Sequence, residues 1–250
     1  MSDSNVKFFS DPVVQLIQHM GSDLSVIQAA RVSTNNDFGV FTEGGSFAGH
    51  SGMEWSEKDK GLIRYLLREK HGTPFEHNSI TFRVEAPIFV FREFHRHRVG
   101  FSYNEMSGRY TKLEPEFYIP SPERPLINVG TSSKPEMAPA DEYIDHATIT
   151  LLKESYEQAW THYESLLNLG IANEVARAVL PVGIKSKMYV TANLRAWMNF
   201  LSLRTHDENA AHVSRPQYEI ELVARKIEHE LGILFPLSMQ YFNEFKRVSP

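Results

Sequence analysis

A dense cluster of cationic side chains lies near the middle of the chain. Five of the seven residues from Arg92 to Arg98 are Arg or His, and they directly follow the apolar run Phe89–Phe91. Guanidinium groups bind phosphate oxygens through paired hydrogen bonds, and an imidazole can donate to a diphosphate or to a ring heteroatom. The cluster therefore predicts an anion-binding site, with a solvated cationic helix face carrying core histidines as the alternative.

Polar residues of several kinds follow within a few positions. The segment Ser102–Tyr110 combines hydroxyls, an amide, a carboxylate, a glycine and a further arginine. Ser and Gly let the backbone approach a phosphate closely, Arg109 could clamp that phosphate, and Asn104 or Glu105 could contact a sugar or a base edge. The segment favours nucleotide binding, although a polar turn would have the same composition.

The two segments together resemble the flavin-dependent thymidylate synthases. Arg96-His97-Arg98 followed by Ser107 is similar to the Arg-His-Arg…Ser signature of that family. Further blocks stand in the family's order: Ala29–Ser33, Thr73–His77, Ala176–Pro181, Asn193–Trp197 and Leu203-Arg204. Because these blocks extend from about residue 25 to about residue 225, the joint match is far more specific than one short motif.

The resemblance implies an enzyme that binds a flavin and a nucleotide. The implied reaction is reductive methylation of dUMP to dTMP, with 5,10-methylenetetrahydrofolate as carbon donor and FAD reduced by NADPH as hydride source. The implied FAD contacts are Ser33, His77, Ser79, Arg96, His97, Arg98, Glu105, Asn193, Arg195 and Asn199. The implied dUMP contacts are Arg92, Glu93, Phe94, His95, Arg96, Glu105, Met106, Ser107, Gly108, Arg109, Arg177 and Arg204.

Arg204 and Ser107 are the catalytic residues that the resemblance implies. In the family, the counterpart of Arg204 lies against the pyrimidine and favours its N3-deprotonated form. A guanidinium keeps its proton near neutrality, so it can stabilise a developing uracil anion electrostatically. The chain contains no cysteine, which excludes the thiolate attack on uracil C6 used by the cysteine-dependent synthases. The resemblance also implies a homotetramer with sites where subunits meet.

Structural roles remain open for some of these residues. His77 could be a buried, hydrogen-bonded histidine, Arg177 could cap the C-terminus of its helix, and Asn193 could cap the N-terminus of the next helix.

The chain also departs from the family at three points, one of which is the unusual length of the segment before Trp55. Eight residues separate Arg98 from Ser107, where the family usually has seven, so an insertion near Val99-Gly100 is expected to shift the loop. The segment after Arg204 is longer than in relatives, and a family histidine before Gln217 is replaced there by Arg215 or His212.

Composition restricts the class of protein. With 250 residues, 42% of them hydrophobic, the chain can bury one sizeable core, and we expect a single domain over residues 1–250.

An alternative function is nucleic-acid binding, with an RNA or single-strand groove over Arg92–Arg109 in which Phe101, Tyr103 and Tyr110 stack on bases. The net charge of -5 counts against it. A metal site at His95 and His97 is disfavoured because no Cys or Asp lies nearby. Since no apolar run has signal-peptide or membrane-span character, a cytoplasmic location is expected.

The elements that position these residues are expected to form a helix-rich α+β chain with a small, mostly antiparallel sheet. Strands are predicted at 80–86, half-buried by alternation, and at 116–120 and 187–191. Helices are predicted where apolar residues recur every three or four positions, at 13–20, 24–32, 57–70, 88–98, 142–169, 173–180, 194–203 and 217–234. The helix at 142–169 is expected to be a core element, and the one at 217–234 to be the last. The Gly-rich segment Ser33–Trp55 is predicted to be a long loop, a lid or an insertion.

Overall fold

The computed structural model describes residues 5–33, 55–132 and 134–250, so the expected Ser33–Trp55 loop lies almost entirely outside the described residues. The chain groups into two compact units. Unit 1 comprises residues 1–13, 84–96 and 104–188, and unit 2 comprises residues 14–83, 97–103 and 189–250. The prediction of a single domain over the whole chain stays a prediction.

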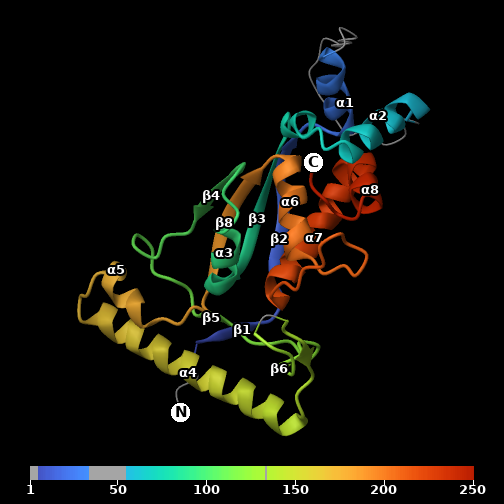
Figure 1. The fold of residues 1–250 in the computed structure, drawn as a ribbon. Coiled ribbons are helices and arrows are strands. Elements are labelled where there is room, and N and C mark those ends of the chain that lie inside the picture. Colours follow the sequence, from blue (N-terminus) through green and yellow to red (C-terminus); the bar gives the residue numbers. More distant parts are fainter. Residues whose placement is uncertain (1–4, 34–54, 133) are drawn as a thin grey trace. The chain divides into compact units, whose positions relative to one another are not determined.

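Short strands and helices occur in mixed order along the chain, with β4 to β7 in succession and α6 to α8 at the end (Figure 1). The helices are α1 (Asp23–Val32), α2 (Glu57–Arg68), η1 (Thr73–Glu76), α3 (Ile88–Phe94), α4 (Glu142–Asn168), α5 (Asn173–Ala176), η2 (Arg177–Val179), α6 (Leu194–Arg204), α7 (Tyr218–Leu234) and α8 (Pro236–Glu244). The strands are β1 (Lys7–Phe9), β2 (Val13–Met20), β3 (Ser79–Pro87), β4 (Phe101–Glu105), β5 (Glu116–Tyr118), β6 (Ile127–Asn128), β7 (Met137–Ala138) and β8 (Lys185–Ala192).

The strands form small sheets. A four-stranded sheet has the order β2-β3-β8-β4. In unit 1, β1 pairs in parallel with β5, placing Lys7 opposite Glu116, and β6 pairs antiparallel with β7. Long helices combined with these short strands confirm the helix-rich α+β class.

An aromatic cluster between α4 and β5 forms the core of unit 1. Phe117 of β5 stacks on Tyr156 of α4 with ring centroids 4.8 Å apart, and Trp160 packs on Tyr163 at 5.0 Å. The hydroxyl oxygen of Tyr163 accepts a hydrogen bond from the backbone N–H of Leu113 at 3.2 Å. One side of α4 is thereby fixed to the segment that follows the predicted nucleotide residues.

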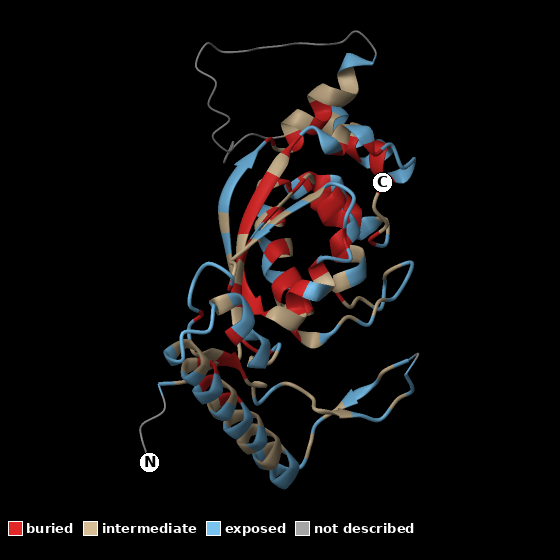
Figure 2. Cartoon of the chain, turned by 90° about the vertical axis from the view of Figure 1, so that its left-hand side faces the viewer, coloured by how far each residue is buried: buried red, intermediate tan, exposed pale blue. Residues whose placement is uncertain are grey.

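The other side of α4 is exposed along its length, as Figure 2 shows. Leu151 is 63% exposed and Tyr143 is 81% exposed, whereas only Tyr156, Trp160 and Tyr163 of this helix are buried. The expectation of a core helix at 142–169 was therefore wrong for most of its length, because only one of its apolar faces has a partner in the described residues. Neither α4 nor any other helix in the described part of the chain is long and apolar enough to cross a membrane.

The core of unit 2 is centred on α6. Its Trp197 is fully buried and meets Phe82 of β3 edge-on at 5.3 Å and Phe101 of β4 at 5.0 Å. The start of α6 is fixed by Asn78, whose Oδ1 accepts from the backbone N–H of Leu194 at 2.6 Å. The site residues carried by α6 therefore stand on a rigid support.

Residues 13–20 form strand β2 instead of the predicted helix. Val14 and Leu16 are half-buried while Val13, Gln15 and Ile17 are exposed, which is the two-residue alternation of a strand with one covered face. The short apolar run was compatible with either period, and pairing with β3 decided in favour of the strand.

Three further boundaries differ from the predictions. Helix α3 ends at Phe94 instead of residue 98, and His95 is exposed instead of sharing the buried face with Phe94. Pro236 does not end the helical region but begins α8, because proline is favoured in the first turn of a helix. On β3, Thr81 and Glu85 are buried as well as the apolar residues, so this strand is covered on both faces instead of one.

Candidate functional site

The predicted site residues divide between the two units. Arg92 to Arg96, Glu105 to Arg109 and Arg177 lie in unit 1, while Ser33, His77, Ser79, His97, Arg98, Asn193, Arg195, Asn199 and Arg204 lie in unit 2. With few exceptions, the first group contains residues predicted to contact dUMP and the second contains residues predicted to contact FAD.

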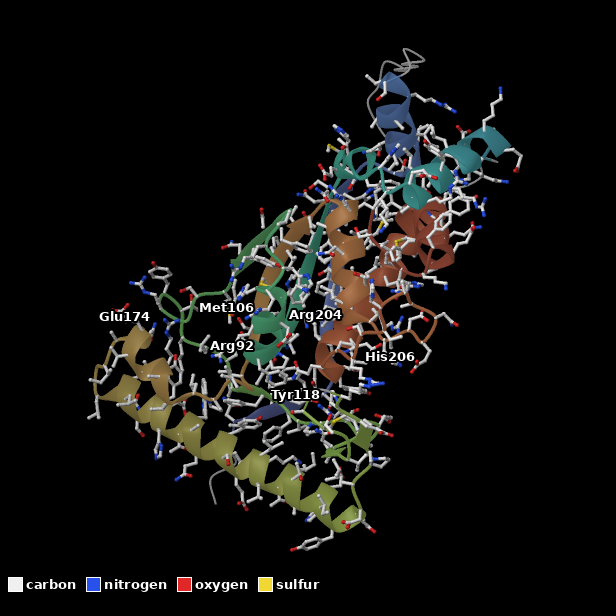
Figure 3. The ribbon with its side chains drawn as sticks, viewed as in Figure 1. Arg92, Met106, Tyr118, Glu174, Arg204 and His206 are labelled. Atoms are coloured by element: carbon white, nitrogen blue, oxygen red, sulfur yellow. The ribbon has the colours of Figure 1, made fainter. Side chains whose placement is uncertain are left out.

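A cavity of about 160 Å³ in unit 1 brings five predicted dUMP contacts together. Its lining includes Arg92 from α3, Glu105 from the end of β4, Met106 and Gly108 from the following segment, and Arg177 from η2. Figure 3 labels Arg92 and Met106 beside α3 and β4. Residues separated by up to 85 positions therefore share one concave surface with two guanidinium groups and one carboxylate.

Arg92 is placed at the cavity by the way α3 packs. Pro87, at the N-cap, ends β3 with an extended backbone, and the short helix then buries Val90, Phe91 and Phe94. The next position on the helix surface, Arg92, is exposed. A guanidinium on a helix with a buried apolar face is held in place by its backbone while its head stays available to an anion.

Gly108 allows the cavity wall to close. It is buried, and a Cβ built on it would lie 3.2 Å from Cδ1 of Leu113 and 3.3 Å from Cδ of Arg177. Those distances are tighter than ordinary van der Waals contact, so any side chain here would displace the stem of Arg177 or the core residue beneath it. Because Gly108 has no side chain, the stem of Arg177 can pack against its backbone at the edge of the cavity.

Two β8 residues that the sequence analysis did not identify also line the cavity. Ser186, only 3% exposed, donates from Oγ to Oε1 of Glu105 at 2.8 Å. Lys185 forms ion pairs with Glu85, at 3.1 Å, and with Glu116. Burial lowers the pKa of Lys185, but the two carboxylates outweigh this effect and the net shift is upward, so its ammonium stays charged.

Only a weak signal in the sequence could have identified this pair. Lys185 and Ser186 lie just before the strand predicted at 187–191, and they begin the observed strand β8, where polar residues are normally interpreted as the solvated face. Their role comes from pairing, since the backbone N–H of Met106 donates to the backbone oxygen of Lys187 at 2.8 Å and brings β8 beside the predicted nucleotide segment.

Ser107 and Arg109 do not belong to the cavity lining. Oγ of Ser107 accepts from the backbone N–H of Arg109 at 3.3 Å, which closes a local turn. Nε of Arg109 donates to Oε2 of Glu174 at 2.9 Å, and its guanidinium lies 5.3 Å from the ring centroid of Tyr110. Glu174, labelled in Figure 3 on α5, thus holds Arg109 in an exposed ion pair.

The rest of the cationic cluster takes several environments. Phe94 is fully buried in the core, so its side chain is not available to a ligand in this structure. Glu93 is half-buried, and His95 and Arg96 are exposed. The cluster thus combines two buried residues, Phe94 and His97, with accessible polar groups, so it contains a core histidine as well as side chains that an anion can reach.

In unit 2, α6 presents one exposed stripe. Six of its eleven residues are buried, whereas Arg195 and Asn199 are exposed and Leu203 is 50% exposed, at spacings of four. Residues four apart lie on the same helix face, so the two predicted FAD contacts form a donor-rich surface that continues into an apolar residue. This surface has the chemistry that a flavin requires, with donors for polar edges and an apolar patch for a ring.

Arg195 is held by the segments around it. Its Nη1 pairs with Oε1 of Glu76 at 2.5 Å and its Nε donates to the backbone oxygen of Pro250 at 2.6 Å. The guanidinium lies against Gly72, where a Cβ would come within 2.4 Å of Cζ. The arginine head therefore occupies a fixed position at the start of α6.

Asn193 has the structural role that was left open. Its Oδ1 accepts from the backbone N–H of Ala196 at 2.9 Å, which is an N-cap of α6. A cap does not exclude a ligand contact through the amide nitrogen. Arg177 likewise stands at the position that was left open, because it is the C-cap residue of α5, and its side chain is exposed at the cavity.

The structural alternative for His77, a buried and hydrogen-bonded histidine, was wrong, because His77 is exposed. Ser79 is half-buried at the start of β3, Ser33 is exposed at the end of α1, and Arg98 is exposed. Residues 99–100, where an insertion was expected, form a turn in which Gly100 has φ +77° and Val99 is 90% exposed, and the insertion itself stays a prediction. The two residues named as replacements for the family histidine, Arg215 and His212, are both exposed.

His97 and Arg204 form a hydrogen-bonded pair in unit 2. Nε of Arg204 donates to Nε2 of His97 at 2.9 Å. Burial, together with the positive charge of Arg204, lowers the pKa of His97 to about 4. At neutral pH the imidazole is therefore uncharged and acts as an acceptor.

The two rival interpretations find little support. Phe101 and Tyr103 stack on each other at 5.8 Å, and Phe101 packs on Trp197, so these rings are used within the core instead of forming a free platform for bases. His95 is exposed and His97 is buried against Arg204, and the described residues contain no group of three possible metal ligands.

Comparisons with known proteins agree on one family. The family model described as thymidylate synthase complementing protein matches residues 15–237. A curated protein from Streptomyces avermitilis, named flavin-dependent thymidylate synthase, is 47% identical over 252 residues and covers 99% of this chain and 97% of its own length. A protein of the same name from Tropheryma whipplei is 46% identical over 245 residues, covering 97% of each chain.

Solved structures give the same result. The UMP/dUMP methylase PolB from Streptomyces cacaoi, bound with 5-bromo-UMP, is 41% identical and superposes with a TM-score of 0.87, covering 98% of this chain and all of its own. Its complex with 5-bromo-dUMP gives a TM-score of 0.85 at 40% identity. Both the fold and the sequence are therefore shared over nearly the whole length.

Proposed function

Because this chain belongs to the family of flavin-dependent thymidylate synthases, we propose that it methylates C5 of dUMP with the carbon of 5,10-methylenetetrahydrofolate, using NADPH as reductant. The observation that carries the proposal is the unit 1 cavity, which collects Arg92, Glu105, Met106, Gly108 and Arg177. The resemblance groups these residues as dUMP contacts, and chain folding brings them to one surface.

The cavity supplies the groups that a nucleoside monophosphate requires. Two guanidiniums, from Arg92 and Arg177, can pair with phosphate oxygens, and this form of binding is geometrically specific. The carboxylate of Glu105, oriented by Ser186, can accept from a sugar hydroxyl or a base N–H. The ammonium of Lys185 adds positive charge beside them, although it is shared with two carboxylates.

The cavity is smaller than a typical ligand pocket. At about 160 Å³ it is below the roughly 300 Å³ at which pockets for small molecules usually begin. The proposal therefore includes further groups outside this cavity, and a homotetramer in which neighbouring protomers complete the sites.

We also propose that the protein is located in the cytoplasm.

When bound, FAD supplies the hydride that converts the transferred carbon into a methyl group. The exposed stripe of α6 offers Arg195 and Asn199 to hold it, with Asn193 and His77 as further polar groups. Arg204, which stays cationic, stabilises negative charge on the pyrimidine as C5 becomes nucleophilic. Since the chain has no cysteine, activation of the ring is left to charge stabilisation instead of covalent attack at C6.

An absorbance spectrum of the purified protein tests the cofactor directly. The protein is expected to be yellow, to release FAD on denaturation, and to convert dUMP to dTMP with NADPH and 5,10-methylenetetrahydrofolate. A colourless protein that also fails to bind added FAD would overturn the proposal.

A second candidate substrate is UMP, which is favoured by the name of the solved relative, a UMP/dUMP methylase. The two substrates differ only in the 2′-hydroxyl. Parallel assays with UMP and dUMP under the same conditions decide between them, and we expect dUMP to give the larger kcat/KM because the curated relatives are thymidylate synthases.

A further inference from the structure

Arg247, which follows α8, is a buried arginine to which the resemblance gives no role. It is only 5% exposed. Its Nη1 pairs with Oε1 of Glu228 on α7 at 2.6 Å and donates to Oδ1 of Asn243 on α8 at 2.5 Å. Its guanidinium carbon lies 5.1 Å from the ring centroid of Phe242. Because a buried charge is costly without a partner, these contacts explain how the guanidinium is tolerated there.

The other terminal nitrogen of Arg247 contacts the residue that follows Arg204. Nη2 donates to Oγ1 of Thr205 at 2.8 Å, and Thr205 is the C-cap of α6. Oγ1 of Thr205 in turn donates to the backbone oxygen of Leu201, inside α6, at 2.6 Å. Nε of Arg247 lies 4.0 Å from Oδ2 of Asp207. One side chain therefore joins α7 and α8 to the C-terminal end of α6.

The backbone at Arg247 is less favourable than the end of a helix requires. The backbone N–H of Arg247 donates to the oxygen of Phe242 at 2.8 Å, and that of Lys246 donates to the oxygen of Asn243 at 3.0 Å. This pattern ends α8 with one left-handed residue, Lys246, at φ +57°. Arg247 is left-handed as well, at φ +60°, which is unfavourable for a residue with a Cβ. A strained residue of this kind indicates that its position has a role.

The residues after Arg247 continue along α6. Oγ of Ser249 donates to the backbone oxygen of Arg195 at 3.1 Å, and the backbone oxygen of Pro250 accepts from Nε of Arg195 at 2.6 Å. Arg195 and Thr205 are ten positions apart, about 15 Å along a helix. Residues 247–250 extend over at most about 11 Å, so the two arginine side chains provide the rest of the reach. The segment therefore contacts both ends of the helix that carries Arg204.

We propose that Arg247 is a positioning residue for Arg204, because by holding Thr205 it fixes the backbone from which the Arg204 side chain extends. The inference rests on the proposed function, since it takes Arg204 to act on bound uracil. The hydrogen bond to His97 orients the head of Arg204, and the Arg247 contact fixes the other end of the same side chain. A catalytic group has to be held within about 0.5 Å by the residues that support it.

Substitutions at the two ends of one hydrogen bond test the role. Arg247→Met removes the donor and keeps an apolar stem. Thr205→Val removes the acceptor and keeps the shape, whereas Thr205→Ser keeps the hydroxyl. The matched control is Arg64→Met, because Arg64 also pairs with a carboxylate of α8, Glu244, at 2.6 Å and lies 5.7 Å from the ring centroid of Phe245, but belongs to α2, outside the proposed machinery.

The ultraviolet difference spectrum of bound 5-bromo-dUMP reports the ionisation of its N3 without any turnover. Wild-type protein is expected to lower the N3 pKa of this nucleotide by about one unit, a tenfold change in the ionisation constant. Arg247→Met and Thr205→Val should each lose about half a unit of that shift, a threefold change. Thr205→Ser and Arg64→Met should keep all of it. The Arg247→Met/Thr205→Val double variant should lose no more than either single variant, because both substitutions remove the same bond.

A role confined to folding would not produce this pattern. Partial unfolding reduces the amount of nucleotide bound, but it leaves the N3 pKa of the bound nucleotide unchanged. On flavin-loaded protein we expect kcat to fall roughly 10-fold in Arg247→Met and in Thr205→Val, since small displacements of a catalytic group cost up to about 100-fold. The KM for dUMP should change little, because the cavity of unit 1 is not altered.

The possible outcomes separate the contact from the function on which it depends. Wild-type N3 ionisation and kcat in Thr205→Val would overturn the positioning role, and this variant decides the question if Arg247→Met does not fold. Additive losses in the double variant, or an equal loss in Arg64→Met, would also overturn it. Wild-type protein that binds 5-bromo-dUMP without lowering its N3 pKa would instead refute the action of Arg204 on uracil. Wild-type protein that binds neither nucleotide nor FAD would refute the proposed function.

Discussion

At the scale of single residues, two groups that the resemblance assigns to catalysis have different surroundings. Ser107 is half-buried, and its hydroxyl accepts a hydrogen bond from the next turn, so it shows no sign of activation as a nucleophile. Arg204 is half-buried, and its Nε donates to the imidazole of His97. A fixed guanidinium, unlike such a hydroxyl, can stabilise developing negative charge.

Replacing these two residues by alanine should therefore have unequal effects. We expect Arg204→Ala to lower kcat by roughly 10²- to 10³-fold, because a preorganised charge is lost, and Ser107→Ala to reduce activity without abolishing it. Steady-state kinetics on flavin-loaded protein measure both. Equal and small losses would show that the roles are wrongly assigned.

A single methyl group at Gly108 should weaken nucleotide binding. The added Cβ would press on Leu113 and on the stem of Arg177, at 3.2 and 3.3 Å, and move the guanidinium out of the cavity. We expect Gly108→Ala to raise the dissociation constant of dUMP about tenfold, equivalent to about 1.4 kcal/mol, as measured by calorimetry.

The chain offers a matched control for that substitution. A Cβ at Gly61, inside α2, would meet nothing within 4 Å. Gly61→Ala should leave dUMP binding unchanged and stabilise the protein by about 0.5–1 kcal/mol, because alanine loses less backbone entropy in a helix. Weaker binding in the Gly61 variant would indicate a general effect of substitution instead of a local one.

At the scale of elements, the boundary between α7 and α8 depends on a residue far away in the sequence. Asp23, fully buried at the start of α1, accepts from the backbone N–H of Leu237 at 2.7 Å and of Ser238 at 3.0 Å. Helix α8 has no side-chain cap of its own at Phe235. Asp23 therefore caps a helix that begins more than two hundred residues later.

Removing this carboxylate should destabilise unit 2. Asp23→Ala leaves two buried N–H groups without an acceptor, and we expect a loss of about 2–4 kcal/mol in the free energy of unfolding measured with urea. Asp141→Ala, which removes the exposed cap of α4, should cost only about 0.5–1 kcal/mol. Similar losses at both positions would mean that burial does not strengthen the Asp23 cap.

The same cap should have a characteristic pH dependence. Burial raises the pKa of Asp23 from 3.8 to about 6, although its hydrogen bonds with Ser238 and Leu237 act in the opposite direction. The native state thus binds this proton more tightly than the unfolded state, so the stability it contributes is full below about pH 4 and is lost as the pH rises through 6. Relative to Asp23→Asn, wild-type protein should gain stability on acidification from pH 7 to pH 4. His97, which titrates in both proteins, cancels in that comparison.

Such long-range contacts explain why some helices and strands could be predicted from the sequence and others could not. Helices α1, α2, α6 and α7 follow from local periodicity, and their boundaries lie within about two residues of those predicted. Strand β2 was mistaken for a helix because its apolar run is short and its pairing partner lies some sixty residues away. The Asp23 cap, and with it the start of α8, depends on packing that no local pattern encodes.

The part of the site that could be predicted from the sequence consists of residue types that stand out when they cluster. Arginines and histidines in a cluster, and a glycine before Arg109, are identifiable by type, and Arg92, Glu105, Gly108 and Arg177 do meet at one cavity. Lys185 and Ser186 are ordinary strand residues that become part of the site only through the pairing of β8. The sequence likewise gave no indication that Arg109 would pair with Glu174.

At the scale of the whole molecule, the distribution of site residues over two units bears on the proposed assembly. Arg177 belongs to unit 1 and Arg204 to unit 2, and the unit 1 cavity, at about 160 Å³, is below the usual size of a small-molecule pocket. Light scattering should show a tetramer at working concentration; a monomer that remains active would count against shared sites. In closed assemblies, one protomer can contribute part of a site whose remainder belongs to its neighbour.

Mixing two inactive variants distinguishes shared sites from self-contained ones. Arg177→Ala and Arg204→Ala protein, unfolded or dissociated together and reassembled, should recover activity if one site takes these arginines from different protomers. Random reassembly then leaves about a quarter of sites with both arginines intact, so turnover should approach a quarter of the wild-type value. Each variant reassembled alone is the control and should stay inactive. If every site takes both arginines from the same protomer, no combination restores an intact pair, and the mixture should be as inactive as its components.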